Sequence, residues 1–253
     1  MSVRTSGRFW AIVSALLLLL SNFPAAGWPK STPPGIPSIS VAPTTIVIGF
    51  VGGFVGHNSG FHSEVQLAKR LSSDYGPAVQ VRTFENRRGQ QARREILRLL
   101  DTDQDGTLSP AEEGRARIVI YGHSWGASEA ITLARRLAVD HIPVLLTVQV
   151  DSVQKWGEDD GSIPPNVIEA ANFYQSDGIL HGRSLIRAAD ASRTRIVGNF
   201  RFKYRGEPVN CGGFSWYARL FMKPHIEIES DPVVWRHVES LIRAQLPPIP
   251  VEK

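Results

Sequence analysis

The sequence has little cysteine, little net charge and no long apolar segment, and each shortage excludes a class of protein. Its one cysteine, Cys211, cannot form a disulfide within the chain and excludes a cysteine-based metal site. A net charge of +4, dispersed along 253 residues, speaks against a nucleic-acid binder. The charge-free run Phe9–Leu20 has twelve residues, whereas a membrane-spanning helix needs about 20. With 42% hydrophobic and 21% charged residues, the chain is expected to fold around a soluble core rather than as a multi-pass membrane protein.

The first 27 residues have the pattern of a targeting segment. Arg4 and Arg8 precede the apolar run Phe9–Leu20, and the small residues Ala25, Ala26 and Gly27 follow it. A positive start, a short apolar stretch and a small-residue exit predict a cleaved secretory signal peptide over residues 1–27. We therefore expect an exported protein, periplasmic or secreted, which would contact a membrane only if this segment stayed uncleaved as an anchor.

Residues 28–43 separate this segment from the folded part. They contain five prolines, and because proline fixes φ and lacks an N–H donor, the stretch is predicted to be an extended linker. From residue 44 onward, β-branched and apolar runs alternate with segments of helical spacing. Strands are expected at 44–50, 79–84, 116–121, 144–150, 167–174 and, more weakly, 195–204; helices are expected at 64–71, 89–100, 126–138 and from Pro232 onward, capped by Asp231. This alternation predicts a single α/β domain over 44–253, with a mostly parallel sheet covered by helices on both faces.

One short motif indicates nucleophilic catalysis. Gly122-His123-Ser124-Trp125-Gly126 matches G-x-S-x-G, with an expected strand before it and an expected helix after it. In that context the serine lies at a sharp turn, and glycines two residues away avoid collisions with the neighbouring elements. The helix that begins behind Ser124 offers free N–H groups and a positive dipole to a developing oxyanion.

With this motif in its context, the chain resembles the α/β-hydrolases, the superfamily of lipases, esterases and thioesterases, from about Thr44 to Leu246. In that family nucleophile, acid and histidine follow one another along the chain, and the first oxyanion donor comes just after an early strand. Residues 49–53, Gly-Phe-Val-Gly-Gly, match that early position, although Ile48 stands where many members have histidine. The resemblance implies an oxyanion hole formed by the N–H of Phe50 or Val51 together with that of Trp125.

A serine nucleophile needs a base to accept its proton, and the base is oriented by an acid. His225, in an expected loop just before the last helix, stands where the family has its histidine. Asp151 ends the strand 144–150, and Asp177 follows the next strand by three residues. We favour Asp151 because its strand is the better defined, with Asp177 as the alternative. His123 is expected to point away and pack, and His57 and His62 to line the mouth of the pocket.

Residues 101–112 form a second motif, Asp-Thr-Asp-Gln-Asp-Gly-Thr-Leu-Ser-Pro-Ala-Glu. They fit the EF-hand loop, in which closely spaced carboxylates are held together by Ca²⁺. The oxygen ligands would come from Asp101, Asp103, Asp105, the Thr107 carbonyl, Ser109 through water, and Glu112 with both oxygens. Only about one helical turn separates Glu112 from the next strand, and no second hand is present. We therefore expect calcium as a structural ion that fastens the loop beside the strand that precedes the nucleophile.

Together these features predict an exported serine hydrolase of carboxylic esters or thioesters, acting on a small-molecule or lipid-like ester without an organic cofactor. Only residues 152–166 and 205–224 could cover the pocket, and their shortness favours modest soluble substrates over bulk lipid. Aromatic residues of the second segment would suit an apolar acyl site: Phe214, Trp216, Tyr217 and Phe221. An amidase or peptidase on the same triad, or a non-catalytic calcium-binding module on this scaffold, are the alternatives.

Overall fold

The computed structural model describes residues 43–205, 209–214 and 216–250. The predicted signal peptide, residues 1–27, and all but the last residue of the predicted linker lie outside the described residues. From Ala42 onward the chain forms one compact unit. Among the described residues, no helix is both long and apolar enough to span a bilayer.

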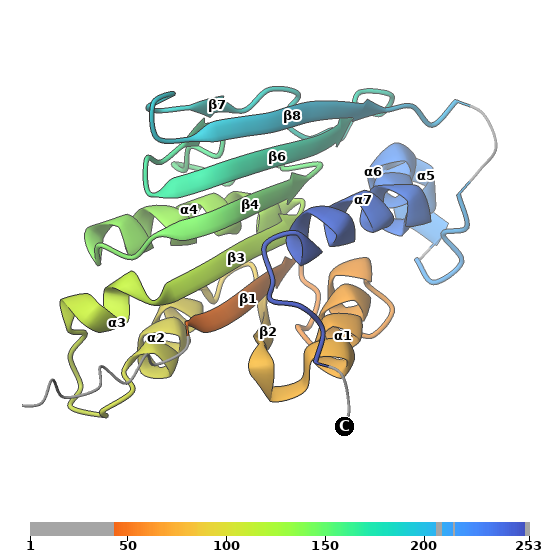
Figure 1. Ribbon diagram of the computed structural model, residues 1–253. Helices are drawn as coiled ribbons and strands as arrows, with labels where there is room; N and C mark the ends of the chain where they lie inside the picture. The colour runs from red at the N-terminus through yellow and green to blue at the C-terminus, as the bar shows by residue number, and fades with distance from the viewer. Residues whose placement is uncertain (1–42, 206–208, 215, 251–253) are drawn as a thin grey trace, which may run out of the picture. The chain divides into compact units, whose positions relative to one another are not determined.

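A six-stranded sheet forms the centre of this unit (Figure 1). Its strand order is β2-β1-β3-β4-β6-β8, and every neighbouring pair is parallel. The strands are β1 (Thr44–Val51), β2 (Gln80–Glu85), β3 (Ala116–His123), β4 (Val144–Val150), β6 (Val167–Gln175) and β8 (Arg195–Phe202). The predicted α/β class with a parallel sheet is therefore confirmed.

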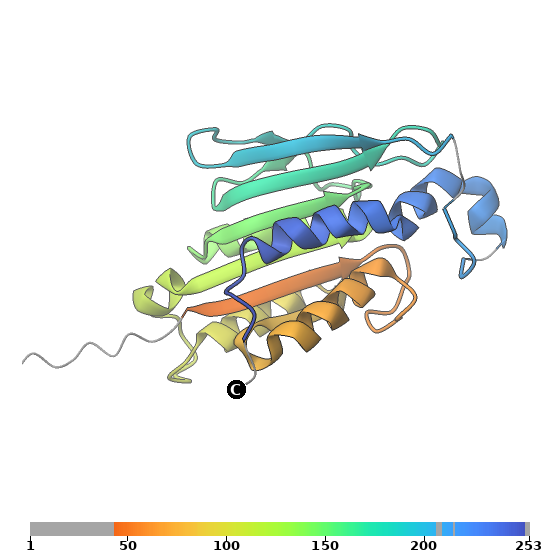
Figure 2. The same ribbon diagram turned by 45° about the vertical axis from the view of Figure 1, so that its right-hand side comes forward.

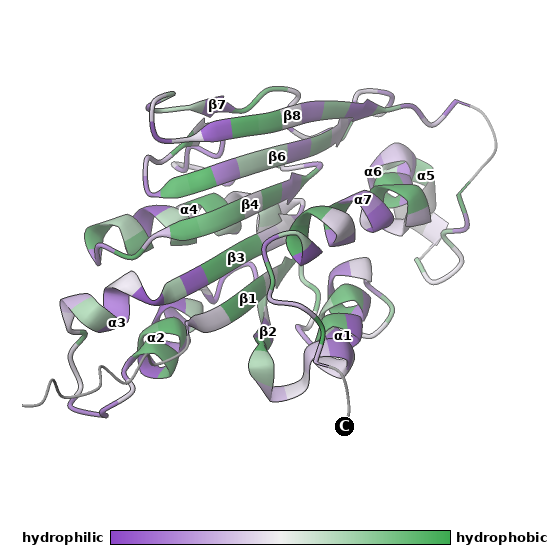
Figure 3. Cartoon of the chain, viewed as in Figure 1, coloured by the Kyte–Doolittle hydropathy of each residue, from purple (hydrophilic) through white to green (hydrophobic). Residues whose placement is uncertain are grey.

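Helices cover both faces of the sheet, as Figure 2 shows with α1 and α7 on the near side. The helices are α1 (Ser63–Tyr75), α2 (Gly89–Leu100), α3 (Pro110–Gly114), α4 (Trp125–Val139), α5 (Trp216–Phe221), α6 (Lys223–Ser230) and α7 (Pro232–Arg243), with a 3₁₀ turn at Gly76–Ala78. One core lies between the sheet and α2 and α4, and a second lies between the sheet and α1 and α7. Because they are buried on both faces, the central strands β1, β3 and β4 are largely hydrophobic along their length (Figure 3).

The long periodic segments fold as predicted, and the short ones differ. Helix α2 and strand β4 have the predicted bounds, and Asp231 caps α7 by accepting the N–H of Val233 at 2.7 Å. Helix α1 extends to Tyr75, four residues beyond the predicted end. The region around His225, predicted to be a loop, is helix α6, whose Lys-Pro start and alternating Ile-Glu-Ile-Glu sequence hide its helical period. A two-stranded parallel sheet of β5 (Ser162–Ile163) and β7 (Arg187–Ala188) has no signal in the sequence.

The order of the strands determines where a ligand can bind. The chain runs from β1 to its neighbour β2 on one side and then returns to β3 on the other side of β1. At such a topological switch point the loops after the two strands diverge and leave a crevice at the carboxyl edge of the sheet. Gly52 follows β1 and Ser124 follows β3, so this crevice lies at the predicted nucleophile.

Candidate active site

Ser124 lies in a strained turn between β3 and α4. Its φ of 56° and ψ of −125° are unusual for a residue other than glycine, and its N–H donates to the Val150 carbonyl at 3.0 Å. The flanking glycines make this turn possible. A Cβ on Gly122 would lie 2.5 Å from the Gly126 carbonyl carbon and oxygen, and a Cβ on Gly126 would lie 2.3 Å from the Phe50 oxygen.

The three predicted triad side chains form one hydrogen-bonded chain. His225 Nε2 lies 2.9 Å from Ser124 Oγ, and His225 Nδ1 lies 2.7 Å from Asp151 Oδ2. All three residues are buried, with Asp151 fully so, Ser124 7% exposed and His225 3% exposed. Ser124 and Asp151 come from the ends of the adjacent strands β3 and β4, and His225 comes from helix α6, which lies at the same edge of the sheet. This geometry lets the imidazole take a proton from the serine while the carboxylate holds its other nitrogen.

Four donors hold the Asp151 carboxylate in this position. Oδ1 accepts the backbone N–H groups of Gly182 at 2.8 Å and Gln175 at 3.2 Å. Oδ2 accepts the Gln175 side-chain amide at 2.8 Å in addition to His225. Gly182 is required for this approach, because a Cβ there would lie 2.2 Å from the Asp151 carbonyl carbon. Sequence reasoning missed Gln175 and Gly182, and neither has a local pattern that would have identified it.

The alternative acid, Asp177, lies in a different environment. Its carboxylate accepts the Tyr204 N–H at 2.8 Å and forms an ion pair with Arg205 at 3.2 Å. These contacts fasten the end of β8 and lower the pKa of Asp177. No contact links Asp177 to His225 among the described residues, so the structure places Asp151, and not Asp177, beside the histidine.

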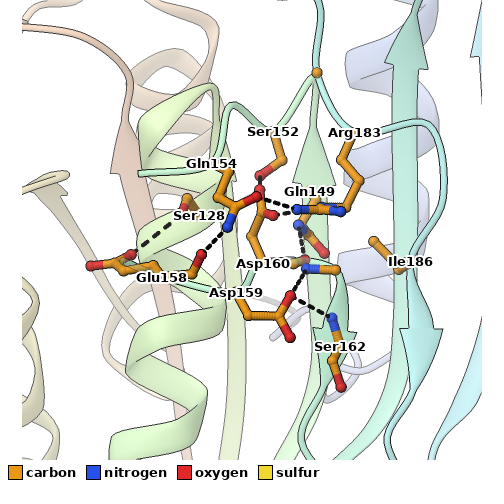
Figure 4. Close-up of polar contacts among 12 residues, drawn as sticks. Ser128, Gln149, Ser152, Gln154, Glu158, Asp159, Asp160, Ser162, Arg183 and Ile186 are labelled. Atoms are coloured by element: carbon orange, nitrogen blue, oxygen red, sulfur yellow. Dashed lines mark hydrogen bonds and ion pairs between the residues drawn. The ribbon is translucent and has the colours of Figure 1, made fainter. Parts of the chain in front are cut away.

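The loop that follows Asp151 is held by a buried ion pair (Figure 4). Asp160 is fully buried and accepts Arg183 Nε and Ser152 Oγ, each at 2.5 Å. The backbone N–H of Arg183 also donates to the Ser152 carbonyl, at 2.8 Å. In Figure 4, Ser152 and Arg183 point toward Asp160 from two sides. The network thereby connects the turn after β4 to the segment that carries Gly182.

The residues predicted for the oxyanion hole occupy different places. Trp125 is the first residue of α4 and lines the pocket beside Ser124. Phe50 is paired on both sides of β1, with Phe84 and with Gly122, so it belongs to the interior of the sheet. Val51 ends the strand and has a ladder partner only on the β2 side. The pocket at this point is lined by the next two residues, Gly52 and Gly53, rather than by Phe50 or Val51.

A pocket of about 490 Å³ opens over Ser124 and His225. Its size lies within the range of small-molecule sites. Most of its lining is apolar and comes from the Gly-rich loop after β1, the start of α4, the loops after β4 and β6, and the segment around α6. The apolar side chains that line it are Phe54, Val55, Phe61, Trp125, Val153, Leu180, Phe214, Met222 and Ile226. Of the aromatic residues predicted for an acyl site, Phe214 lines the pocket. Trp216 and Phe221 are exposed on α5 instead, at 70% and 68%, and the Tyr217 side chain lies outside the described residues.

Two predictions about the remaining histidines need correction. His123 does not point away from the site, because its ring contacts that of His225 at a centroid distance of 4.6 Å, with the ring planes tilted by 34°, and lines the pocket. His62 lines the pocket as expected, whereas His57 lies outside it, against Glu85 and the end of β2. Burial lowers the pKa of His62 and holds that of His123 well below its ordinary value.

Two buried glutamates lie beside these histidines. Glu64, in the first turn of α1, is fully buried, and Glu229 of α6 is 5% exposed. Burial raises the pKa of each to about 8, and for Glu64 the nearby Glu229 charge adds to the effect. The sequence analysis did not identify either residue. A glutamate on the apolar stripe of α1, three residues before Leu67 and seven before Leu71, was the signal available.

In the predicted calcium loop, three of the proposed ligands are close together. One carboxylate oxygen each of Asp101, Asp103 and Asp105 lie within 4.8 Å of one another. Gly106, with a φ of +85°, makes the turn, and Asp101 Oδ1 is buried without a hydrogen-bond partner. Thr107 donates its N–H to Asp105 Oδ1 at 2.8 Å. The last predicted ligand, Glu112, makes a separate set of contacts.

Glu112 closes a capping box at the start of α3 instead of joining the three aspartates. Its carboxylate accepts from Ser109 N and Oγ and from Thr102 N and Oγ1, at distances of 2.7 to 3.0 Å. These donors, first the N–H groups of Ser109 and Thr102, lower the pKa of Glu112 to about 2. The carboxylate of Glu112 is thus ionised, and it lies in the same short loop as the aspartates.

Comparison with known proteins extends to the backbone arrangement only. Neither a protein-family model nor a curated protein sequence matches the chain. Among solved structures, a cutinase-like protein from Cryptococcus sp. is similar at 12% identity and a TM-score of 0.43, over 81% of this chain and 96% of that one. An acetylxylan esterase is similar at 10% identity and a TM-score of 0.40, over 82% and 100% of the two chains. Human thioesterase 2 has 10% identity and a TM-score of 0.40, over 80% and 96%. At such low similarity, function is inferred from the geometry of the site itself.

Proposed function

We propose that the chain is a serine hydrolase that cleaves carboxylic esters or thioesters through an acyl-enzyme. One observation carries this proposal: the buried, continuous chain of hydrogen bonds from Ser124 through His225 to Asp151 at the strained turn between β3 and α4. The strain exposes Ser124 to the pocket, which a merely structural serine does not need.

In the proposed mechanism, Ser124 Oγ attacks the carbonyl carbon while its proton passes to His225 Nε2. Asp151 stabilises the resulting imidazolium through Nδ1. The oxyanion is stabilised by the N–H of Trp125 at the start of α4, and by an N–H at the end of β1, for which Val51 is better placed than the doubly paired Phe50. His225 then returns the proton to the leaving group, and water releases the acyl group by the same route.

The apolar pocket supports modest substrates. At about 490 Å³ it has room for a small acyl or alcohol group, and its walls offer few polar partners. The polar side chains His62, His123 and Glu229 line the pocket together with aromatic rings, and we expect an ester to bind with its carbonyl between Ser124 and Trp125. The substrate we propose is a small-molecule ester of limited chain length.

The test is hydrolysis of a p-nitrophenyl ester series by the chain without residues 1–27. Ser124→Ala should lower kcat by about 10⁶-fold, because removal of a triad nucleophile costs that much. Ser128→Ala is the matched control, since Ser128 is a buried serine one turn along α4 and should retain activity. If turnover does not depend on Ser124, amides and thioesters are tried next. Failure of all three, together with no labelling of Ser124 by a fluorophosphonate, would favour the binding-module alternative.

We also propose that residues 101–112 bind calcium as a structural ion. The gathered oxygens of Asp101, Asp103 and Asp105, the glycine turn at Gly106 and the buried unpaired oxygen of Asp101 support this. Glu112 would turn from its capping contacts toward the aspartates on binding. Oxygen donors in this number and spacing suit Ca²⁺.

Calcium titration of the thermal unfolding temperature tests this site. Calcium at 100 times its Kd stabilises the folded state by about 2.7 kcal/mol, which raises Tm by about 5–10 °C for a chain of this size. Asp103→Asn should abolish the shift, whereas Glu113→Gln, next to the loop but outside the proposed ligand set, should retain it. A wild-type Tm that does not change with calcium would exclude a calcium site at residues 101–112.

Finally, we propose that the protein is exported and loses residues 1–27. The support is the residue pattern alone, with Arg4 and Arg8 before the apolar run and small residues after it. Intact mass of the protein recovered outside the cytoplasm should correspond to a chain that begins at Trp28. Recovery of the full-length chain from membranes would show an uncleaved anchor instead.

A further inference from the structure

Four polar side chains converge behind the proposed nucleophile and base, and the triad uses none of them. His62 and Glu64 come from the start of α1, His123 from the last position of β3, and Glu229 from α6. We call these four residues the His/Glu cluster. One ligand atom each of His62, Glu64 and Glu229 lie within 4.8 Å of one another. His123 Nδ1 lies 3.3 Å from Glu229 Oε2 and 3.7 Å from Glu64 Oε1.

The cluster contains an unusual number of buried polar atoms without partners. Glu64 is 0% exposed, and neither of its carboxylate oxygens has a hydrogen-bond partner. His123 is 2% exposed, and neither of its ring nitrogens has one. A fully buried polar group without a hydrogen-bond partner is unfavourable, because it has lost its contact with water and nothing replaces it. His123 Nδ1 and Glu64 Oε1 lie 3.7 Å apart, so a single ligand between them would contact both.

The spacing of the cluster fits a tetrahedral metal ion. Ligand atoms held at 2.0–2.2 Å from an ion in tetrahedral geometry are about 3.3–3.6 Å apart. The two His123 distances, 3.3 and 3.7 Å, lie close to this range. His62 Nδ1 already contacts Glu229 Oε1. On binding, His62 would move away from Glu229, and the side chains would rotate to bring all four ligand atoms to one centre.

We propose that the His/Glu cluster binds one divalent transition-metal ion, with Zn²⁺ as the fitting ion. Two imidazole nitrogens and two carboxylate oxygens, without sulfur, form a donor set that suits zinc, whereas calcium and magnesium prefer oxygen alone.

Such an ion would position the triad from behind. His123 directly precedes Ser124, and Glu229 lies one helical turn after His225 on α6. The ion would therefore connect the segment that carries the nucleophile to the helix that carries the base, and connect both to the start of α1. The contact between the tilted rings of His123 and His225, whose centroids are 4.6 Å apart, would transmit this alignment. The role assigned to the ion is structural, so ester hydrolysis takes no step through it.

Metal binding by the untagged chain without residues 1–27 tests the proposal. The chain is freed of metal with a chelator, saturated with calcium so that residues 101–112 are occupied, and titrated with Zn²⁺ by calorimetry. Wild type should bind one zinc per chain and show a higher Tm. Glu64→Gln should weaken zinc binding by at least about 100-fold, since even residues outside a ligand set contribute 10–100-fold. Glu227→Gln is the matched control, a buried glutamate on α6 outside the cluster, and should bind zinc like wild type.

Two further measurements keep the result decisive. His62→Ala removes a ligand at the edge of the pocket with less disturbance of the core, and circular dichroism of both variants without metal shows whether they fold. Co²⁺ should give the intense visible spectrum of a four-coordinate site in wild type and lose it in the folded variants. Absence of zinc binding in wild type, or equal binding by folded Glu64→Gln, would overturn the proposal. A chain that hydrolyses esters through Ser124 but binds no zinc would overturn the metal site and leave the proposed activity in place.

Discussion

Replacement of Asp151 by asparagine tests the proposed triad with little change of shape. Asp151 has a φ of +43°, a region that asparagine tolerates better than most residues, so the backbone turn is retained. The carboxylate accepts four donors: two backbone N–H groups on Oδ1, and Gln175 Nε2 and His225 Nδ1 on Oδ2. Asparagine supplies one oxygen in place of two. The less costly orientation keeps that oxygen on the two backbone donors, which turns the NH₂ group toward Gln175 and His225.

This orientation determines the expected magnitudes. His225 responds to the new donor by carrying its proton on Nε2, which faces Ser124 Oγ at 2.9 Å and can then no longer accept the serine proton. A triad histidine held in the wrong tautomer lowers kcat about 10⁴-fold, equivalent to about 5 kcal/mol in the barrier. One N–H of the Gln175 amide loses its acceptor while the other still donates to the Leu180 carbonyl at 3.0 Å. One buried unsatisfied donor costs about 1–3 kcal/mol of stability.

The assay compares kcat and KM for a p-nitrophenyl ester, with urea unfolding in parallel. Asp177→Asn is the matched control, because Asp177 is the alternative acid and binds Tyr204 and Arg205 instead of the histidine. Asp151→Asn should lose kcat with little change in KM, and Asp177→Asn should retain kcat. A kcat for Asp151→Asn within tenfold of wild type, or an equal loss in Asp177→Asn, would refute the assignment of the acid.

Three other substitutions follow from the geometry. Gly126→Ala places a Cβ 2.3 Å from the Phe50 oxygen, so it should lower the free energy of unfolding by at least about 1–3 kcal/mol and abolish hydrolysis. The control Gly114→Ala has open space around the new Cβ and should leave stability and activity unchanged. Urea unfolding and ester hydrolysis measure the two effects. Arg183→Met leaves Asp160 charged and fully buried beside Ser152 alone, and should destabilise the fold by about 3–5 kcal/mol. The control Arg187→Met, at an exposed position on β7, should change stability by less than about 0.5 kcal/mol. Equal urea-unfolding midpoints for the two variants would contradict the role of the Arg183–Asp160 pair. Phe54→Ala removes a ring that is 86% exposed yet packs edge-on against Trp125 at 5.5 Å in the pocket. The variant should therefore have a higher KM and an unchanged Tm. A fall in Tm without a change in KM would show that the ring serves packing only.

Local patterns carried most of the fold prediction. Strand β4 is a mostly apolar run because both its faces are covered, and α2 keeps its buried residues at helical spacing, so the bounds of both elements could be predicted. Helix α6 was missed because its eight residues begin with Lys-Pro and include the alternating Ile-Glu-Ile-Glu of residues 226–229, which hides the helical period. The two-residue strands β5 and β7 are too short for any periodicity to show.

The candidate site likewise has a part that local sequence patterns predict and a part that they do not. The chemistry of Ser124 could be predicted because a strand, a glycine-flanked serine and a helix adjoin one another in the chain. The choice between Asp151 and Asp177 could not, since both follow strands and only the position of α6 places Asp151 at 2.7 Å from His225. The oxyanion donors were similarly uncertain, because the ladder pairing of Phe50 and Val51 differs only in the folded sheet.

The sequence by itself determined the alternation of strands and helices, the turn that presents Ser124 and the acidic spacing of residues 101–112, because each depends on residues close together in the chain. Tertiary structure alone decided which carboxylate meets His225, and it brought Glu64 and Glu229 together behind the site. These two glutamates are far apart in sequence, and no periodic pattern relates them. Contacts of that kind arise when α1 and α6 pack at the carboxyl edge of one parallel sheet, so they appear only once the chain is folded.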